Sequence, residues 1–570
     1  MRRDDRSAEH ALRTLAPWLA AALVLAVIGF TRGAPAPVGV FYDDGVYLDL
    51  ALALAGGHGY RHLALPGAPV GVHYPPLYPA WLALWSALRP PVAAWRALAW
   101  LKLGNALLAA LAIVPWTRWG TKRLHLHPLL AAGCAVASVL LVPARAVTST
   151  LFSEPLAWLL LGLALLAGEA LDSPSVESEG ADAPPVVTAR GGRLPLAAVV
   201  IGLLPLSRSI LLPFAIAAAL LVVARRTWSP ARRAALVALL LVPSIAWSVF
   251  VSVHAAGIPT AWAGNYGSYT GMWRASWHDA GDLLGLAAHQ VVSLWHTARG
   301  IWTGPGAVIA LAACAAGLWR LARESRLAAL GTAGYFAIVL VWPVNPDRFL
   351  WGVLPLITII GVLGVVWGWR AAPRVPLRLA TLALALLPAG ACTRLNVRGY
   401  HNDGWLVPQW GEARLYAPVV AWVRTLPAEA VVLTQNDPLL SIATGRRTAP
   451  LLPPDLGAIV DPARAVGATR RVQASLCAAG HGWIAVPDTA DAAWYAVRAL
   501  ATSTDSRVRF GPPLSLGASA AAARFECGKT AGHGAEAGLP APGARGDAAV
   551  GHQLSGSGYP RGVESSRRVH

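Results

Sequence analysis

Charged side chains are scarce in this chain of 570 residues, of which only 13% are Asp, Glu, Lys or Arg while 55% are hydrophobic. The mean hydropathy of +0.50 is too high for an ordinary soluble protein. Apolar runs of roughly 17–22 residues, the length needed to cross a bilayer, recur along the first 392 residues. This composition predicts a polytopic membrane protein.

Several motifs of nucleotide-dependent enzymes are absent. The sequence has no Asp-x-Asp motif, no Walker A motif and no Gly-x-Gly-x-x-Gly after a strand, so it indicates neither nucleotide sugars nor ATP as substrates. Cysteine is also rare, and its five occurrences show no metal-binding spacing. A disulfide between Cys477 and Cys527 in an oxidising compartment is left open.

Acidic residues are outnumbered, with 29 Asp and Glu against 47 Lys and Arg, which gives a formal net charge of +18. In a soluble protein this excess would suggest nucleic-acid binding. Here the basic residues cluster in short loops between apolar runs, where they mark the cytoplasmic side. We therefore expect contacts with membrane lipids and no nucleic-acid partner. The expected location is the cell membrane, multi-pass, with a cytoplasmic N-terminus and an extracytoplasmic C-terminus.

About eleven apolar runs are predicted to span the membrane. They are Leu15–Phe30, Trp95–Trp116, Pro128–Val142, Leu151–Leu171, Leu194–Leu206, Ile210–Val223, Ala234–Val253, Pro305–Leu321, Leu327–Val344, Phe349–Trp369 and Leu377–Leu387. Residues 31–94 form the first outer loop. Two stretches in it, Gly45–Ala55 and Pro76–Leu88, are too short to span and are predicted to lie as helices in the interface.

The chain divides into two predicted domains. Residues 1–392 form an α-helical transmembrane domain, interrupted by a disordered cytoplasmic linker at 172–193. Residues 393–529 form a small extracytoplasmic α/β domain, and residues 530–570 a disordered tail. In the α/β domain we expect strands at Ala430–Thr434 and Gly482–Val486 and helices at Leu415–Thr425, Pro438–Ala443 and Ala490–Ala501.

Two adjacent carboxylates, Asp43 and Asp44, stand in the first outer loop, followed by Tyr47. Carboxylates at a membrane surface are costly to place without a purpose. One of them is expected to be the N-cap of the helix Gly45–Ala55. The other is a candidate general base, because a carboxylate within hydrogen-bond reach of an acceptor hydroxyl or amine can take its proton.

Further candidates lie at the outer ends of the predicted spans. Glu154 follows Ser153 at the start of the fourth span, where it either begins a helix or faces a cleft. Lys102, Arg208 and Arg348 run against the positive-inside tendency, so each needs a counter-ion, which is either a protein carboxylate or a phosphate. His73 is a candidate metal ligand or phosphate contact.

Short motifs around these residues resemble those of the GT-C glycosyltransferases, in particular the protein O-mannosyltransferases and aminoarabinose transferases. The matching stretches are the acidic pair with Tyr47, Gly-His-Gly-Tyr at 57–60, Tyr-Pro-Pro-Leu-Tyr-Pro at 74–79, Leu-Ser-Arg at 206–208 and Asp-Arg-Phe-Leu at 347–350 with Leu-Pro-Leu at 354–356. The chain departs from the pattern at Asp44, where those families usually have Glu.

The resemblance implies a GT-C fold and a lipid-phosphate-linked sugar donor. It implies Asp43 as the base, with Asp44 beside it, and Glu154 as a second acidic residue of the catalytic site that orients the acceptor or binds a metal. Together with the residues singled out above, the predicted substrate-binding set is Tyr47, His73, Tyr74, Lys102, Arg208 and Arg348, with the arginines clamping the donor phosphate.

The predicted function is the transfer of a hexosyl or pentosyl group from a polyprenyl-phosphate sugar to a glycan, lipid or protein acceptor on the outer face of the membrane. The sequence requires no cofactor and leaves a divalent metal open. The alternatives are a secondary transporter or lipid flippase, and a non-catalytic membrane assembly protein. Transporters tend to show midplane charges and inverted repeats, whereas the charges here cluster at the outer ends of the spans and no repeat is evident.

Overall fold

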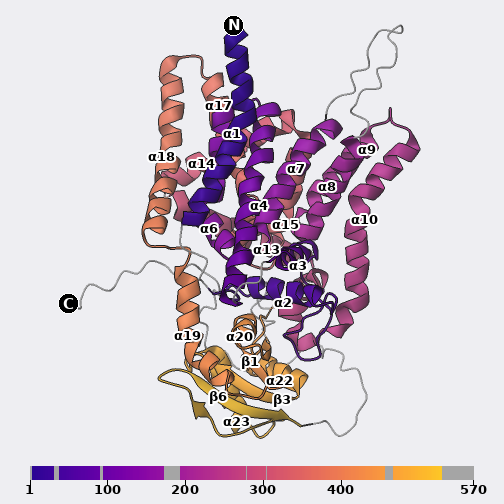
Figure 1. Cartoon of the computed structure of the whole chain (residues 1–570), viewed down its shortest axis with the longest axis vertical. Helices are drawn as coiled ribbons and strands as arrows, with labels where there is room; N and C mark the ends of the chain where they lie inside the picture. The colour runs from indigo at the N-terminus through magenta and orange to yellow at the C-terminus, as the bar shows by residue number, and fades with distance from the viewer. Residues whose placement is uncertain are drawn as a thin grey trace, which may run out of the picture.

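The computed structural model describes residues 3–30, 37–89, 94–172, 193–277, 279–302, 304–455 and 466–528. The predicted linker at 172–193, apart from its two end residues, and the predicted tail lie outside these ranges. Figure 1 shows a helical part, with a small sheet domain at one of its ends.

Helices make up the chain as far as His401. Their bounds are α1 (Arg3–Phe30), α2 (Asp43–Ala55), α3 (Leu77–Ala87), α4 (Ala94–Lys122), α5 (Pro128–Leu140), α6 (Val142–Ser149), α7 (Glu154–Asp172), α8 (Arg193–Ser207), η1 (Ser209–Leu211), α9 (Leu212–Ala224), α10 (Pro230–His254), η2 (Ala255–Gly257), η3 (Thr260–Trp262), α11 (Ala263–Tyr266), α12 (Tyr269–Ser276), α13 (Ala280–Trp302), α14 (Pro305–Glu324), α15 (Arg326–Leu340), α16 (Asp347–Trp351), α17 (Leu354–Ala371) and α18 (Val375–His401).

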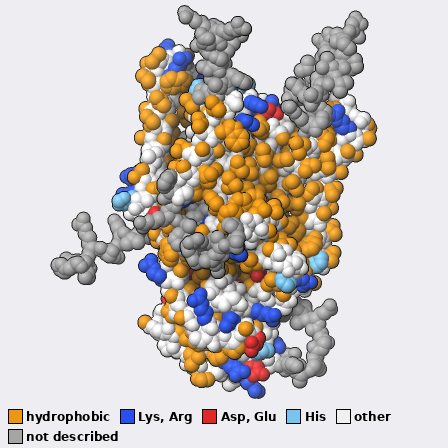
Figure 2. Space-filling view, in the orientation of Figure 1, with side chains coloured by type: hydrophobic (Ala, Val, Ile, Leu, Met, Phe, Trp, Pro, Cys, Tyr) orange, Lys and Arg blue, Asp and Glu red, His pale blue; other side chains and the backbone are white. Residues whose placement is uncertain are grey.

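Several of these helices are suited to a membrane. In the ranges given above, six are long and apolar enough to cross a bilayer, and the pair α5–α6, bent by 62°, makes a seventh. Every predicted span coincides with a helix, including four shorter apolar ones. Figure 2 shows hydrophobic side chains covering the visible side of the helical part, with Lys and Arg gathered toward its two ends. The protein is therefore a membrane protein, and the number of about eleven spans stays a prediction.

The segment between α1 and α4, called here the α1–α4 loop, contains the two expected short helices. In Figure 1, α2 and α3 lie between the helical part and the sheet domain. The expectation about capping is wrong: α2 begins at Asp43, and the residue before it, Tyr42, makes no side-chain cap. The Asp44 carboxylate instead accepts hydrogen bonds from the backbone N–H groups of Gly39 and Phe41, 2.8 and 3.1 Å away, and so closes the turn that leads into α2.

The C-terminal domain is built on a mixed sheet. Among the described residues it has six strands, in the order β2-β1-β3-β6-β4, with β5 pairing β6. Strand β1 is parallel to β2 and β3, and β3 is antiparallel to β6. The bounds are α19 (Val407–Val423), β1 (Val431–Thr434), α20 (Asp437–Thr444), β2 (Arg447–Pro450), α22 (Ala468–Ala479), β3 (His481–Val486), α23 (Ala492–Thr502), β4 (Val508–Phe510), β5 (Leu514–Ser515) and β6 (Ala521–Cys527).

The expected strands correspond to β1 and β3, and the expected helices to α19, α20 and α23. The predicted domain boundary at residue 393 falls inside α18, which continues to His401. Cys477 of α22 and Cys527 of β6 form a disulfide, with their Cα atoms 5.1 Å apart. This bond ties a helix to the sheet and settles the alternative that the sequence leaves open.

Candidate active site

A cavity of about 1800 Å³ lies beside the start of α2. Its walls come from the α1–α4 loop, α10, α12, α13, α16 and α19, so both the helical part and the C-terminal domain contribute. Six of the predicted site residues line it, namely Asp43, Tyr47, His73, Tyr74, Arg208 and Arg348. The side chains of Asp44, Glu154 and Lys102 are buried outside the lining.

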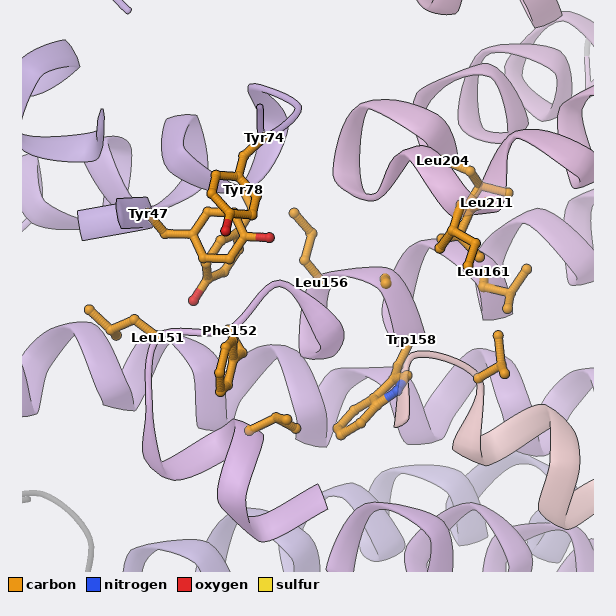
Figure 3. Close-up of a cluster of buried hydrophobic side chains, with 14 of the residues drawn as sticks. Tyr47, Tyr74, Tyr78, Leu151, Phe152, Leu156, Trp158, Leu161, Leu204 and Leu211 are labelled. Carbon is orange, nitrogen blue, oxygen red and sulfur yellow. The ribbon is translucent and has the colours of Figure 1, made fainter. Parts of the chain in front are cut away.

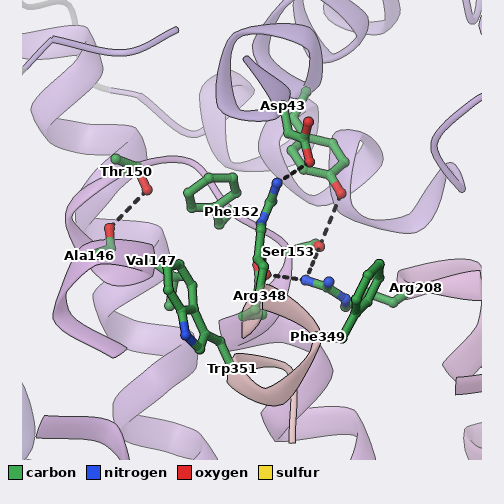
Figure 4. Close-up of polar contacts among 12 residues, drawn as sticks. Asp43, Ala146, Val147, Thr150, Phe152, Ser153, Arg208, Arg348, Phe349 and Trp351 are labelled. Carbon is green, nitrogen blue, oxygen red and sulfur yellow. Dashed lines mark hydrogen bonds and ion pairs between the residues drawn. The ribbon is translucent and has the colours of Figure 1, made fainter. Parts of the chain in front are cut away.

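Asp43 and Arg348 form the ion pair that faces the cavity (Figure 4). Asp43 is in the first turn of α2, and Arg348 is in the five-residue helix α16 between α15 and α17. Their side chains are 23% and 30% exposed, so both are accessible to a substrate. The Tyr74 hydroxyl donates a hydrogen bond of 2.5 Å to Asp43, and the Arg348 guanidinium lies 4.0 Å from the ring centroid of Phe152.

Glu154 and Arg208 form a second ion pair directly behind the first. Glu154 is fully buried in the first turn of α7, where the positive end of the helix dipole favours a carboxylate. Arg208 is only 10% exposed and sits in extended backbone between α8 and η1. The Arg348 Nε lies 3.6 Å from Glu154 and so connects the two pairs. The site thus holds two carboxylates and two guanidinium groups in one network.

Tyrosine rings support the Asp43 side of this network. The ring of Tyr47 lies 4.6 Å from that of Tyr74 and 4.9 Å from that of Tyr78, as Figure 3 illustrates. The Tyr47 hydroxyl pairs with the hydroxyl of Ser153 at 3.1 Å. Burial raises the pKa of Tyr47 and of Tyr74, so both stay neutral and Tyr74 keeps the proton that it donates to Asp43.

His73 connects two loops. Its Nδ1 lies 2.5 Å from the carbonyl oxygen of Gly267, and its ring packs 4.5 Å from that of Tyr269 in α12. Burial lowers the pKa of His73, so the ring is neutral and Nδ1–H is the donor. His73 thereby fixes residues 255–277, called here the α10–α13 loop, against the α1–α4 loop.

Two supporting residues, Asn105 and Tyr78, were not among the predicted site residues. Asn105 accepts a hydrogen bond of 2.9 Å from the Tyr78 hydroxyl and donates to the carbonyl oxygens of Thr150 and Phe152, at 2.9 and 3.2 Å. It thereby holds the segment that leads to Glu154. A lone Asn inside an apolar span was the available signal for it, since such residues are expensive in a membrane. Tyr78 belongs to the Tyr-Pro-Pro-Leu-Tyr-Pro motif, where its position marked it.

Asp43 and Glu154 each hold an arginine. In the described part of the chain, no group of three or more His, Cys, Asp or Glu side chains is placed to bind a metal ion. The positive charge that faces the cavity beside Asp43 comes from Arg348, with Arg208 behind it.

Comparison with known proteins gives the fold. The structure superposes on that of ArnT from Cupriavidus metallidurans in the apo state with a TM-score of 0.50 and 15% sequence identity, over 89% of this chain and 97% of that one. The chain has the fold of the GT-C membrane glycosyltransferases.

A second match is the archaeal oligosaccharyltransferase AglB from Archaeoglobus fulgidus, solved with an inhibitory peptide and a dolichol-phosphate. Its TM-score is 0.45 at 12% identity, over 87% of this chain and 71% of that one. No protein-family model and no curated protein sequence matches the chain.

Proposed function

We propose that the protein transfers a sugar from a polyprenyl-phosphate-linked donor to an acceptor on the outer face of the membrane in which the protein lies. In this proposal Asp43 is the general base. The observation that supports this most strongly is the pairing of Asp43 with Arg348 on the wall of a large cavity at the end of a GT-C-type helical bundle. Both side chains are accessible, whereas Asp44 and Glu154 are fully buried.

The charges of the network suit a donor phosphate. Arg348 neutralises Asp43 in the absence of substrate, and a phosphate that takes over the guanidinium would release the carboxylate. Arg208 lies behind Arg348 and adds positive charge where the phosphate oxygen leaves. Donor binding would thus switch Asp43 from an ion-paired carboxylate to a free base.

The proposed step is a direct displacement. Asp43 takes the proton from the acceptor hydroxyl or amine, and the freed electron pair forms a bond to the anomeric carbon. The bond from that carbon to the phosphate oxygen breaks, and the oxygen leaves with its electron pair, stabilised by Arg348 and Arg208. Such a displacement inverts the anomeric configuration. In this step the arginines supply positive charge beside the leaving oxygen.

The test is transfer of radiolabel from a panel of polyprenyl-phosphate monosaccharides by purified protein in detergent, with mixed glycan, lipid and peptide acceptors. Wild type is compared with Asp43→Asn and with the control Asp488→Asn, which removes a carboxylate from a turn of the C-terminal domain. Transfer by wild type and the control, lost in Asp43→Asn, is the expected result. Equal transfer by all three proteins, or donor flipping across vesicles without transfer, would contradict the proposal.

A further inference from the structure

The C-terminal domain packs directly against the turn that carries Asp43. Helix α20 contacts the start of α2, and the Asn436 side chain donates a hydrogen bond of 3.1 Å to the carbonyl oxygen of Val40. A Cβ atom at Gly39 would lie 2.6 Å from the Cα of Leu439, and one at Gly45 would lie 2.6 Å from the Pro438 side chain. Glycine at both positions therefore lets the two domains come into backbone contact.

Asp437, the first residue of α20, is buried at this contact. It accepts a hydrogen bond from the Tyr266 hydroxyl, which comes from the α10–α13 loop. The ring of Tyr42 lies 5.8 Å from that of Tyr266, and the Tyr42 hydroxyl is buried beside Asp437. One buried carboxylate thus joins the C-terminal domain to both loops that line the cavity.

Tyr42 is the link from this junction to the base. It directly precedes Asp43 and has φ = 66°, a backbone conformation that a bulky residue adopts only when its surroundings hold it there. The ring of Tyr266 and the carboxyl group of Asp437 lie against Tyr42 and hold it there. If the tyrosine relaxed toward negative φ, the carboxylate of the next residue would turn away from Arg348 and the cavity.

We propose that Asp437 is a positioning residue, which holds Tyr42 and through it keeps Asp43 facing the cavity. The inference rests on the proposed role of Asp43 as general base. It assigns the C-terminal domain a part in building the catalytic site itself, in addition to any contact that this domain makes with an acceptor.

The junction is also built to respond to pH. Four titratable groups surround Asp437: Tyr42 and His62 of the α1–α4 loop, Asp49 of α2 and Tyr266 of α11. The His62 ring lies 3.5 Å from the Asp49 carboxylate and packs against the ring of Tyr266. Burial raises the pKa of Asp437 to about 7, and burial also raises the pKa of both tyrosines, which stay neutral. The closed junction therefore holds its proton more tightly than an opened one. Closure is strongest below about pH 4, weakens as the pH rises to about 7, and does not weaken further above it.

The experiment compares wild type, Asp437→Ala, Asp437→Asn and the control Asp488→Asn by radiolabel transfer between pH 5 and 8. Ala removes the acceptor for Tyr266, whereas Asn keeps that acceptor and cannot ionise. We expect a kcat for Asp437→Ala about tenfold below wild type at pH 7, because small misplacements of a catalytic group are costly. The KM for the donor should stay within about twofold. Wild type and the control should lose activity as the pH rises from 5 to about 7 and then level off, whereas Asp437→Asn should show no such loss.

Amide hydrogen exchange of residues 37–47 provides a readout that needs no turnover. It should be faster in Asp437→Ala than in wild type and unchanged in Asp488→Asn. If wild type transfers no sugar, the proposed function fails, and the exchange data still decide whether Asp437 orders the turn. Equal exchange, or a kcat and pH profile like those of wild type, would overturn the proposal. Should Asp437→Ala not fold, Tyr42→Phe, which removes only a hydroxyl, is subject to the same two measurements.

Discussion

The ion pair between Asp43 and Arg348 differs from the pair between Glu154 and Arg208 mainly in exposure. The first faces the cavity with side chains 23% and 30% exposed, while the second is 0% and 10% exposed. Exposed pairs contribute little to stability and exchange partners readily, whereas breaking a buried pair strands a charge. A carboxylate–guanidinium pair can therefore serve catalysis where it faces the cavity and stabilise the fold where it is buried. We call these the cavity-facing pair and the buried pair.

Asp43→Asn is expected to show the largest difference between the two pairs, because it should affect catalysis strongly and stability only slightly. Loss of a general base should lower kcat a thousandfold to ten-thousandfold, about 4 to 5.5 kcal/mol of transition-state stabilisation. Unfolding stability should change by no more than about 1 kcal/mol, since Arg348 is partly exposed and retains Glu154 nearby. Single-turnover transfer and thermal unfolding followed by tryptophan fluorescence measure the two effects. A large stability loss without a kcat defect would remove the distinction between the pairs.

Glu154→Gln should give the opposite pattern. It leaves the Arg208 guanidinium buried with one charge partner fewer, which is expected to destabilise the fold by about 4 kcal/mol. Thermal unfolding in detergent measures the loss, and the double variant Glu154→Gln/Arg208→Gln should recover at least half of it because the stranded charge is gone. A double variant as unstable as the sum of the two single variants would show that the pair acts through something other than its charges.

Sequence motifs predicted much of this site, and there are physical reasons why the rest could not be predicted from the sequence. The motifs around Asp43, Arg208 and Arg348 predicted residues that the structure brings together from α2, the α8–η1 junction and α16. The roles of these residues remain predictions. The residue pattern alone cannot tell which of two adjacent carboxylates faces a cavity, because consecutive helical residues point about 100° apart and the packing of the helix decides between them. Only the family resemblance favoured Asp43.

The contact between Asp437 and Tyr266 is a second limit. The two residues are 171 positions apart, and each alone has the pattern of an ordinary buried or capping residue. Their meeting depends on how the C-terminal domain docks, which no local pattern encodes. Strands β4 and β5 of that domain were missed because they are only three and two residues long, too short for an alternation to be visible.

Asp44, the carboxylate next to Asp43, can be compared with the two pairs through the pH dependence of the free energy of unfolding. Burial raises its pKa to about 6, although backbone N–H groups oppose the shift. The folded protein therefore binds this proton more tightly than the unfolded chain. The associated stability is fully present below about pH 4 and is lost as the pH rises to about 6, a change of about 3 kcal/mol.

Asp44→Asn should flatten this slope in thermal unfolding between pH 4 and 7. It should also lower stability throughout, since an amide offers one oxygen to the two N–H groups of Gly39 and Phe41. Unfolding curves of wild type and variant that run parallel over this range would show that Asp44 is ionised in the fold at every pH tested, and would place it with the cavity-facing pair.

The smallest expected effect separates charge from geometry in the cavity-facing pair. Arg348→Lys keeps the positive charge but loses the planar fork that can bind a phosphate with two parallel hydrogen bonds. We expect kcat/KM for the donor to fall about tenfold, or about 1.4 kcal/mol, mostly through KM, with little change in stability because the pair is partly exposed. Direct binding of the polyprenyl-phosphate sugar to catalytically inactive Asp43→Asn, with and without Arg348→Lys, isolates the phosphate contact from the chemical step. Equal donor affinity in the two backgrounds would mean that Arg348 serves only to hold Asp43, and the phosphate would then have to be bound elsewhere in the cavity.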